Sequence, residues 1–153
     1  MRLEGRQIVA LPIATVWERL NDPRALRACT PGLEKLEARD ADHYEAVLEV
    51  KLPAITGRFE GTLEYLERTP PGRLRLRLQG KGAIGFVDGE VTMELTGVAE
   101  GTNVAYLADV QIGGQISRLG QRMLSGVTRE MAGQFFDAFE RWRPEAPEQS
   151  VAP

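Results

Sequence analysis

GGQISRLGQRMLSGVTREMAGQFFDAFERW, residues 113–142, carries the longest helical pattern in the chain. At about 100° per residue its apolar side chains gather on one broad face, and most of its charged side chains lie opposite. The pattern predicts one amphipathic helix from about residue 115 to residue 142, long enough to cover one face of a sheet. The predicted apolar face comprises Ile116, Met123, Leu124, Val127, Met131, Phe135, Ala138 and Trp142.

Three glycines, Gly120, Gly126 and Gly133, fall inside this predicted helix. Each costs up to about 1 kcal/mol relative to alanine in a helix interior. Gly120 falls near the middle of the apolar face, which allows two interpretations: close packing against a neighbouring element, or room for an apolar ligand. Gly120→Leu should separate them. If Gly120 faces open space, leucine should keep or raise the melting temperature, because it has the better helix propensity. If Gly120 is a close contact, leucine overpacks the core and should lower the free energy of unfolding by about 1–3 kcal/mol.

Upstream of this segment the apolar pattern changes to period two, which is typical of half-buried strands. The alternation covers residues 43–52, 55–65 and 73–79, the last reading RLRLRLQ, and two further strands at 91–95 and 104–112 lead into the helix. Hairpin-length connections make these strands antiparallel. Residues 2–11 read as a first strand, and residues 12–29, PIATVWERLNDPRALRAC, as two short helices, the second opened by Pro23.

An apolar sheet face must be covered, and only the C-terminal helix is large enough to cover it. The prediction is therefore an α+β helix-grip fold. A curved antiparallel sheet of about seven strands surrounds the long C-terminal helix, and two short helices follow the first strand. We expect one ligand-binding domain over residues 1–143 and a disordered, proline-rich tail over residues 144–153.

Composition narrows the function classes. Of 153 residues 42% are hydrophobic, and 19 basic against 22 acidic side chains give a net charge of −3, with no basic block typical of nucleic-acid binding. One cysteine excludes an internal disulfide. No signal segment and no apolar run of about 18 residues is present. We therefore expect a cytoplasmic protein whose contact with a membrane surface is at most reversible.

Residues suited to catalysis or metal binding are scarce. His43 is the single histidine and is predicted to lie on the polar face of its strand, and Cys29, in ACTPG, reads as a packed structural residue. One histidine and one cysteine cannot form a His/Cys metal site, so we predict no catalytic and no metal residues. The glycine-rich GKGAIGFVDG (80–89) lacks the ending of a phosphate-binding loop. We interpret it as a connection between strands near the mouth of a cavity, where Lys81 could make a polar contact with a ligand.

Glycines on the inward side of the strands bear on the open question about Gly120. Gly57 and Gly61 are predicted to face the same interior, and small residues on both walls favour an unfilled, apolar pocket. Such a dry pocket tends to take an apolar guest. The residues predicted to line it are Phe59, Gly61, Tyr65, Leu76, Phe86, Met93, Tyr106, Gly120, Met123, Leu124, Val127, Met131 and Phe135.

Several segments together resemble the CoxG family of carbon monoxide dehydrogenase subunits, within the START-like (SRPBCC) helix-grip superfamily that includes polyketide cyclases. They are VWERLNDPRALRACTPG (16–32), GKGAIGF (80–86), GTNVAY (101–106), VQIGGQISRLGQRM (110–123) and QFFDAF (134–139). The resemblance covers about residues 2–140. It implies a lipophilic ligand between sheet and helix, and no established catalytic residues. It also implies a link to molybdenum-containing carbon monoxide dehydrogenases and related hydroxylases, in membrane recruitment, maturation or electron transfer to quinone. Some members carry a longer membrane-attaching extension, and the tail after Trp142 is not expected to anchor the chain.

Three hypotheses of function follow from the residues and the resemblance together. The first is a non-enzymatic carrier of a quinone or lipid that acts beside a molybdenum hydroxylase. The second is a small cyclase or hydrolase that uses pocket tyrosines and a carboxylate as acid and base. The third is an assembly factor with a filled interior and a partner-binding surface. The polar content of the pocket discriminates between the first two, because an enzyme needs convergent ionisable groups.

Overall fold

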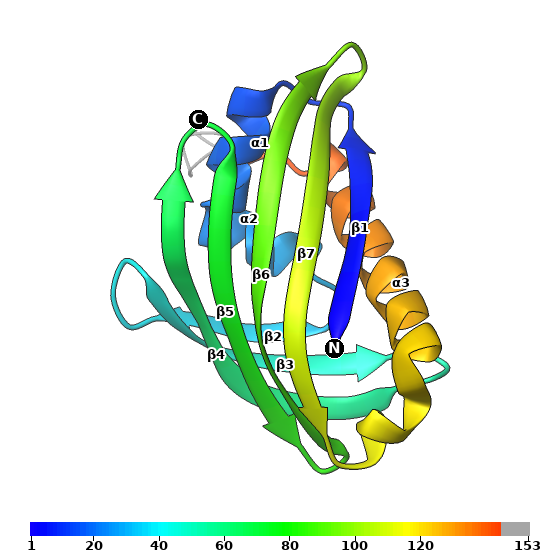
Figure 1. Cartoon of the computed structure of the whole chain (residues 1–153). Helices are drawn as coiled ribbons and strands as arrows, with labels where there is room; N and C mark the ends of the chain where they lie inside the picture. The colour runs from blue at the N-terminus through cyan, green and yellow to red at the C-terminus, as the bar shows by residue number, and fades with distance from the viewer. Residues whose placement is uncertain (145–153) are drawn as a thin grey trace.

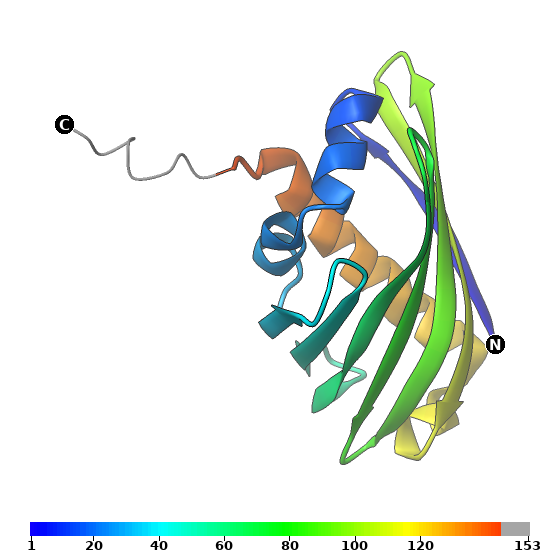
Figure 2. The ribbon, with the colours of Figure 1, turned by 90° about the vertical axis from the view of Figure 1, so that its left-hand side faces the viewer.

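The computed structural model describes residues 1–144, in which one seven-stranded antiparallel sheet curves around a long helix (Figures 1 and 2). The order of the strands is β1-β7-β6-β5-β4-β3-β2, so the first strand pairs with the last. This is the predicted helix-grip architecture. The strands are β1 (Arg2–Val9), β2 (Leu33–Ala38), β3 (His43–Lys51), β4 (Thr56–Thr69), β5 (Arg73–Gly82), β6 (Gly85–Val98) and β7 (Gly101–Gly113).

The two short predicted helices are present as α1 (Ile13–Leu20) and α2 (Pro23–Cys29). Asp22 is the N-cap of α2 and accepts a hydrogen bond from the Arg24 backbone N–H at 2.9 Å, while Pro23 occupies the first helical position. A carboxylate cap followed by proline is a strong signal for the start of a helix. The carboxylate accepts a hydrogen bond from one of the free N–H groups of the first turn, and the proline ring fixes φ near its helical value.

The long helix α3 (Gly120–Arg141) lies along the β1 side of the concave face (Figures 1 and 2). Polar contacts hold it there at both ends. Gln121 donates to the Arg2 carbonyl at 2.7 Å, and Glu140 accepts from the Ala10 backbone N–H at 3.2 Å. Arg19 of α1 donates to the Trp142 carbonyl at 2.7 Å, where a cation also suits the negative end of the helix dipole.

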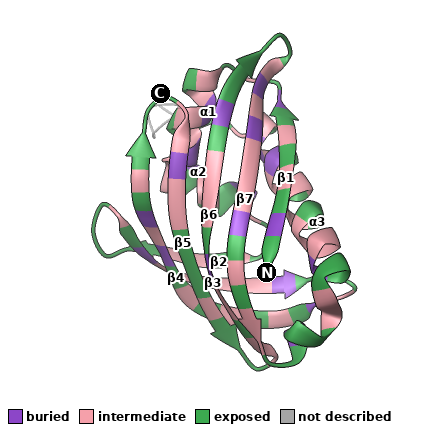
Figure 3. Cartoon of the chain, viewed as in Figure 1, coloured by how far each residue is buried: buried purple, intermediate pink, exposed green. Residues whose placement is uncertain are grey.

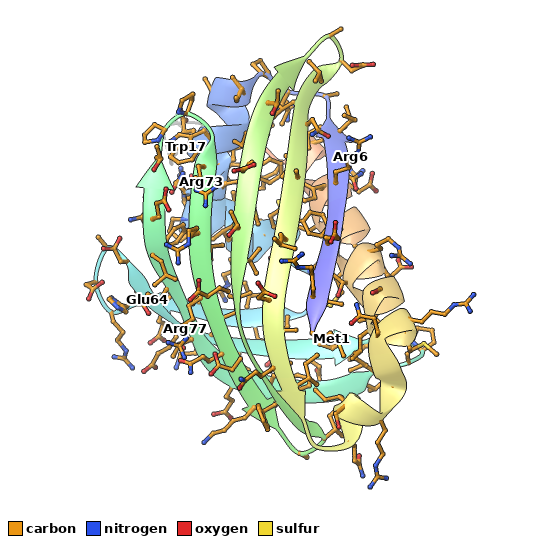
Figure 4. All side chains as sticks on the ribbon, viewed as in Figure 1. Met1, Arg6, Trp17, Glu64, Arg73 and Arg77 are labelled. Carbon is orange, nitrogen blue, oxygen red and sulfur yellow. The ribbon has the colours of Figure 1, made fainter. Side chains whose placement is uncertain are left out.

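The outer face of the sheet is polar, as the period-two pattern predicts. The arginines of β5 project outward and pair with carboxylates of β6: Arg75 with Glu90 at 2.9 Å, and Arg77, which Figure 4 labels, with Asp88 at 3.3 Å. These pairs are largely exposed to solvent, so each contributes little to stability. They show which face of β5 is the outer one, so the intervening leucines Leu74, Leu76 and Leu78 point inward by strand alternation.

The C-terminal helix differs from the predicted continuous helix over 115–142. A short 3₁₀ helix, η1 (Gln115–Leu119), comes first, and α3 begins only at Gly120. Gly120 has φ +78° and ψ 169°, a conformation that side-chain-bearing residues rarely adopt. The chain therefore turns at Gly120. The glycine is needed for the positive φ of this turn and does not lie in a helix interior. Gly126 and Gly133 do lie inside α3, and no atom lies within 4 Å of a Cβ built on either.

Gly120→Ala and Gly126→Ala should change the stability in opposite directions, although a Cβ meets open space at both positions. At Gly120 the positive φ makes alanine cost about 1–3 kcal/mol. At Gly126 alanine gains up to about 1 kcal/mol through helix propensity. Thermal melts should therefore show a lower melting temperature for the first variant and a higher one for the second. Equal shifts would mean that the turn at Gly120 is absent.

Asp22→Ala should lower the free energy of unfolding by about 1 kcal/mol through loss of the α2 cap. The Arg24 side chain lowers the pKa of Asp22. The ionised Asp22 carboxylate therefore stabilises the fold fully at pH values above the ordinary aspartate pKa. This contribution is lost as the pH falls through the lowered pKa of Asp22 in the folded protein. Urea titrations across acid pH should show the difference from wild type shrinking towards low pH. Asp137→Ala, which removes an exposed pair with Arg141 on α3, serves as the control and should change little.

Candidate ligand-binding interior

The interior between α3 and the sheet is tightly packed beside α1 and α2 and is looser along the middle of β5. Along β5 the inward-facing leucines show this directly, since Leu74 is 1% exposed whereas Leu78 is 39% exposed. Leu78 lies opposite Leu63 on β4 and Gly89 on β6, both on the inner face of the sheet. Figure 3 shows the same change, with little buried surface on β5 and β6 towards their lower connection. An inward leucine this accessible indicates that side chains do not close the interior at this level.

Two clusters of buried apolar residues flank this region. The first packs β1 and the middle strands against α1, α2 and the C-terminal half of α3, around Phe136 and Phe139. The second packs β1, β3 and β7 against η1 and the N-terminal half of α3, around Ile116 and Leu124. Leu78, Tyr106 and Met131 belong to neither cluster. They occupy the stretch of interior between the two.

A groove of about 390 Å³ opens into the fold on the side away from β1. Its size lies within the usual range of ligand pockets. Three segments form it: the connection from α2 to β2 with the start of β2, the end of β3 with the residue that follows it, and the middle of α3. Its lining residues are Pro31, Gly32, Glu34, Glu49, Val50, Lys51, Leu52, Met131 and Gln134.

A backbone contact holds the first wall of the groove in place. The Glu49 N–H of β3 donates to the Gly32 carbonyl at 2.8 Å. Gly32 has φ +81°, and a Cβ there would lie 1.9 Å from the Glu49 carbonyl oxygen. Only glycine fits this close approach. The wall is therefore built by the Pro31–Gly32 turn pressed onto β3, next to the inward-facing Val50.

The tyrosine side chains of the interior make packing contacts with neighbouring elements. The Tyr65 hydroxyl donates to the Leu20 carbonyl at 2.9 Å, and its ring lies 4.0 Å from the Arg68 guanidinium and edge-on to Tyr44. Burial raises the pKa of Tyr65 well above its ordinary value. Burial also raises the pKa of Tyr106, whose ring lies over Gly5 of β1. Both phenols are therefore neutral at physiological pH.

His43 and Cys29 occupy the environments predicted for them. The His43 ring lies at the surface, with Nδ1 2.8 Å from Asp40 and Nε2 3.1 Å from Glu64, and the hydrogen bond to Asp40 raises its pKa. Cys29 is buried in the first cluster, and desolvation raises the pKa of its thiol. Within residues 1–144, no three His, Cys, Asp or Glu side chains are grouped so as to hold a metal ion.

Most of the predicted lining residues do face the interior, but they are divided among its parts. Tyr65, Leu76, Met93 and Phe135 belong to the first cluster or pack against it, and Phe59, Leu124 and Val127 belong to or pack against the second. Gly61, Tyr106 and Met131 lie between or beside these clusters, and Met131 reaches the groove.

Three predicted lining residues lie elsewhere. Phe86 is 45% exposed and points to the outer face, where its ring covers Gly113, because alternation along β6 sends Val87 inward instead. Met123 is 49% exposed on the first turn of α3. Gly120 lies at the turn between η1 and α3 rather than on an interior wall.

The inward strand glycines also differ from the expectation that they leave space. A Cβ at Gly61 would lie 1.7 Å from the Gln79 carbonyl oxygen on β5, and one at Gly57 would meet Ile84 at 3.0 Å. Neighbouring backbone and a side chain already occupy these positions. Gly61 thus permits the close approach of β4 and β5 where the sheet bends, which is the other established use of glycine inside a strand.

Sequence reasoning missed several residues that line the groove. Val50 and Leu52 were recognisable as inward by their period-two spacing. The contributions of Pro31, Gly32 and Gln134 had no periodic signal, because they depend on how the α2–β2 connection folds against β3 and α3.

A second hollow, of about 510 Å³, lies on the outer face of β5, β6 and β7. Its lining is mainly polar and includes Arg77, Asp88, Glu90, Asp109 and Gln111. An apolar guest would gain little there, so this hollow is a poor match for the predicted ligand class.

Comparison with known proteins places the chain in a family. The sequence profile of CoxG, a subunit of carbon monoxide dehydrogenase, matches residues 5–141, so the chain belongs to the CoxG family. No curated protein sequence matches the chain. None of the helices in the described part of the chain is long and apolar enough to cross a bilayer.

Solved structures agree with this fold. A conserved protein from Geobacillus kaustophilus is 30% identical, with a TM-score of 0.86 over 92% of this chain and 93% of that chain. A protein from Chromobacterium violaceum is 16% identical, with a TM-score of 0.65 over 92% and 94%. A protein from Rhizobium leguminosarum is also 16% identical, with a TM-score of 0.67 over 92% of both chains. The latter two support the fold alone.

Gly61→Ala should destabilise the protein by more than about 2 kcal/mol, because the methyl group overlaps the β5 backbone. Gly80, its direct cross-strand partner, supplies the matched control. A Cβ at Gly80 meets Phe59 at an ordinary 3.8 Å, so Gly80→Ala should change the free energy of unfolding by less than about 1 kcal/mol. Urea unfolding measures both. Similar values for the two variants would contradict the close approach at Gly61.

Proposed function

We propose that this member of the CoxG family is a non-enzymatic accessory protein that holds a hydrophobic small molecule between α3 and the sheet. The guest is a quinone or lipid that enters through the groove between β3 and α3. The observation that carries this proposal is a groove of ligand size between β3 and α3, together with an inward-facing leucine on β5, Leu78, that is 39% exposed.

The chemistry of the interior supports a carrier over a catalyst. Apart from the tyrosines and Cys29, Thr102 is the single buried residue with a polar side chain among residues 1–144, and its hydroxyl donates to the Leu11 carbonyl at 2.8 Å. The most buried phenol, Tyr65, is likewise engaged with the Leu20 carbonyl. Acid–base catalysis needs ionisable groups that converge on a substrate with matched pKa values. An apolar wall with few polar groups instead suits a guest recognised mainly by its hydrophobic surface.

The groove also has a polar rim suited to the headgroup of such a guest. Glu34, Glu49, Lys51 and Gln134 line the groove together with the apolar Val50 and Met131. An amphipathic molecule would bury its tail against the inner face and leave its polar end at this rim. A quinone with an apolar tail and a single-chain lipid both have this form.

Membership of the family supports an enzyme partner for the carrier. The family is named for a component of carbon monoxide dehydrogenase. We therefore propose a molybdenum hydroxylase of that kind as the partner, with the carrier delivering or collecting the guest at the enzyme.

Binding of an apolar probe should depend on Met131 and not on Met123. Both methionines lie on α3, but only Met131 lines the groove, whereas Met123 is 49% exposed elsewhere. Met131→Gln should weaken binding of a short-chain quinone analogue about fivefold to tenfold, because a polar amide replaces an apolar wall of similar size. Met123→Gln should leave the affinity within about twofold of wild type. Fluorescence titration without vesicles measures both, and native mass spectrometry of the purified wild type should reveal a co-purified lipophile.

Two results would overturn the proposal. One is failure of the folded wild-type protein to bind either a quinone analogue or a fluorescent fatty acid, which would favour an assembly factor. The other is turnover of a bound ester or polyketide-like compound, which would favour an enzyme.

A further inference from the structure

Helix α3 has one face that lies opposite its buried side chains Leu124, Phe136 and Phe139. Neighbouring positions on this face are three or four residues apart, which is the spacing of side chains on one side of a helix. Figure 1 shows α3 along one edge of the molecule, where a second molecule has access to it. We call this side the outer face of α3, and it consists of Arg122, Gly126, Arg129, Glu130, Gly133 and Asp137.

The charges of the outer face have few partners of their own. Arg122, Arg129 and Glu130 are exposed, and none of them forms an ion pair within residues 1–144. Asp137 pairs with Arg141 at 3.3 Å, but both side chains are at least 70% exposed, so this pair contributes little. On the outer face of the sheet, in contrast, the arginines of β5 are paired with carboxylates. The charges of α3 therefore remain available to a partner.

These charges are ordered along the helix. The two arginines lie in its N-terminal half, and the two carboxylates lie in its C-terminal half. The six positions of the outer face form three pairs that share one midpoint on the helix: Arg122 with Asp137, Gly126 with Gly133, and Arg129 with Glu130. A two-fold axis through this midpoint places the positive half of one helix opposite the negative half of a second, antiparallel copy. The helix dipoles favour the same antiparallel direction.

The two glycines of the outer face are not explained by the single chain. No atom in the described part of the chain lies within 4 Å of a Cβ built on Gly126 or Gly133, so no packing contact requires glycine there. Neither residue has a positive φ. Each nevertheless costs up to about 1 kcal/mol in a helix interior. Glycine at such positions allows a second helix to approach closely, because the distance between packed helices depends on the side chains at the contact.

We propose that two copies of the chain form a two-fold symmetric dimer in which the outer faces of α3 pack against each other in antiparallel directions. The glycines lie at the closest approach, and the arginines of each helix face the carboxylates of the other. A single pair of helices buries a small area, so the dimer is reversible and forms at micromolar concentration. None of the six residues lines the groove, so the proposal does not depend on the carrier function.

Charge reversal with analytical ultracentrifugation tests the dimer. Arg122→Glu/Arg129→Glu makes the charges of the outer face wholly acidic, and Glu130→Lys/Asp137→Lys makes them wholly basic. Each double variant alone should lose roughly tenfold or more in dimer affinity, because like charges then face each other. An equimolar mixture of the two should regain at least the wild-type affinity, because an acidic face then meets a basic one. Added salt should weaken the wild-type dimer.

The glycines are tested by a variant in which the stability of the chain and that of the dimer change in opposite directions. Gly126→Gln/Gly133→Gln should keep or raise the melting temperature at concentrations where the protein is monomeric, because glutamine has the better helix propensity. The same variant should lose roughly tenfold in dimer affinity, because the long side chains hold the two helices apart.

A third double variant controls for net charge. Arg6→Glu/Lys81→Glu changes the net charge as much as Arg122→Glu/Arg129→Glu does, but its two residues are exposed on β1 and β5. It should keep the dimer affinity within about twofold of wild type. Thermal melts show that each variant is folded.

Three results would overturn the proposal. The first is a wild-type protein that stays monomeric up to about 0.5 mM. The second is a dimer whose affinity falls equally in the control and in the α3 variants, or in none of them, which would place the interface elsewhere. The third is an equimolar mixture of the acidic and basic variants that remains monomeric, because two antiparallel outer faces would then have associated.

Discussion

The position of α3 along β1 governs the rest of the structure. Hydrogen bonds from Gln121 to the Arg2 carbonyl and from the Ala10 N–H to Glu140 hold both ends of the helix at this side of the sheet. One helix covers a strip of about 10 Å, whereas a curved sheet of seven strands presents a wider apolar face. Helices α1 and α2 cover a further part at one end. Part of the inner face is left accessible, since Leu78 of β5 is 39% exposed and a groove opens between the end of β3 and the middle of α3.

This arrangement explains why so much of the fold was predictable. The alternation in RLRLRLQ assigns an inner and an outer face to β5, and the arginine–carboxylate pairs of the structure confirm that assignment. The start of α2 was likewise recognisable from Pro23, and Asp22 caps it as that position requires. Such features are encoded within a few residues, so local physical rules suffice to find them.

The glycines show where local rules stop. Gly120 matched the helical period, but its positive φ comes from the turn between η1 and α3, which no periodicity reveals. Gly61 was correctly placed on the inner face, yet whether it faces space or the β5 backbone depends on how strongly the sheet bends. Phe86 was assigned to the interior although the alternation through Val87 points it outward. The site was therefore less predictable than the fold, because a groove between distant elements depends on tertiary placement.

The pairing of β1 with β7 has a consequence for how the chain folds. The N-terminal ammonium of Met1 donates to the Val110 carbonyl, so residues at the start of the chain find their partners only after nearly the whole sheet has been made. Closing such a long loop is slow compared with forming hairpins. During synthesis the apolar face of β3 to β6 emerges before α3 exists to cover it. Until α3 covers it, this inner face is a surface prone to aggregation in the nascent chain.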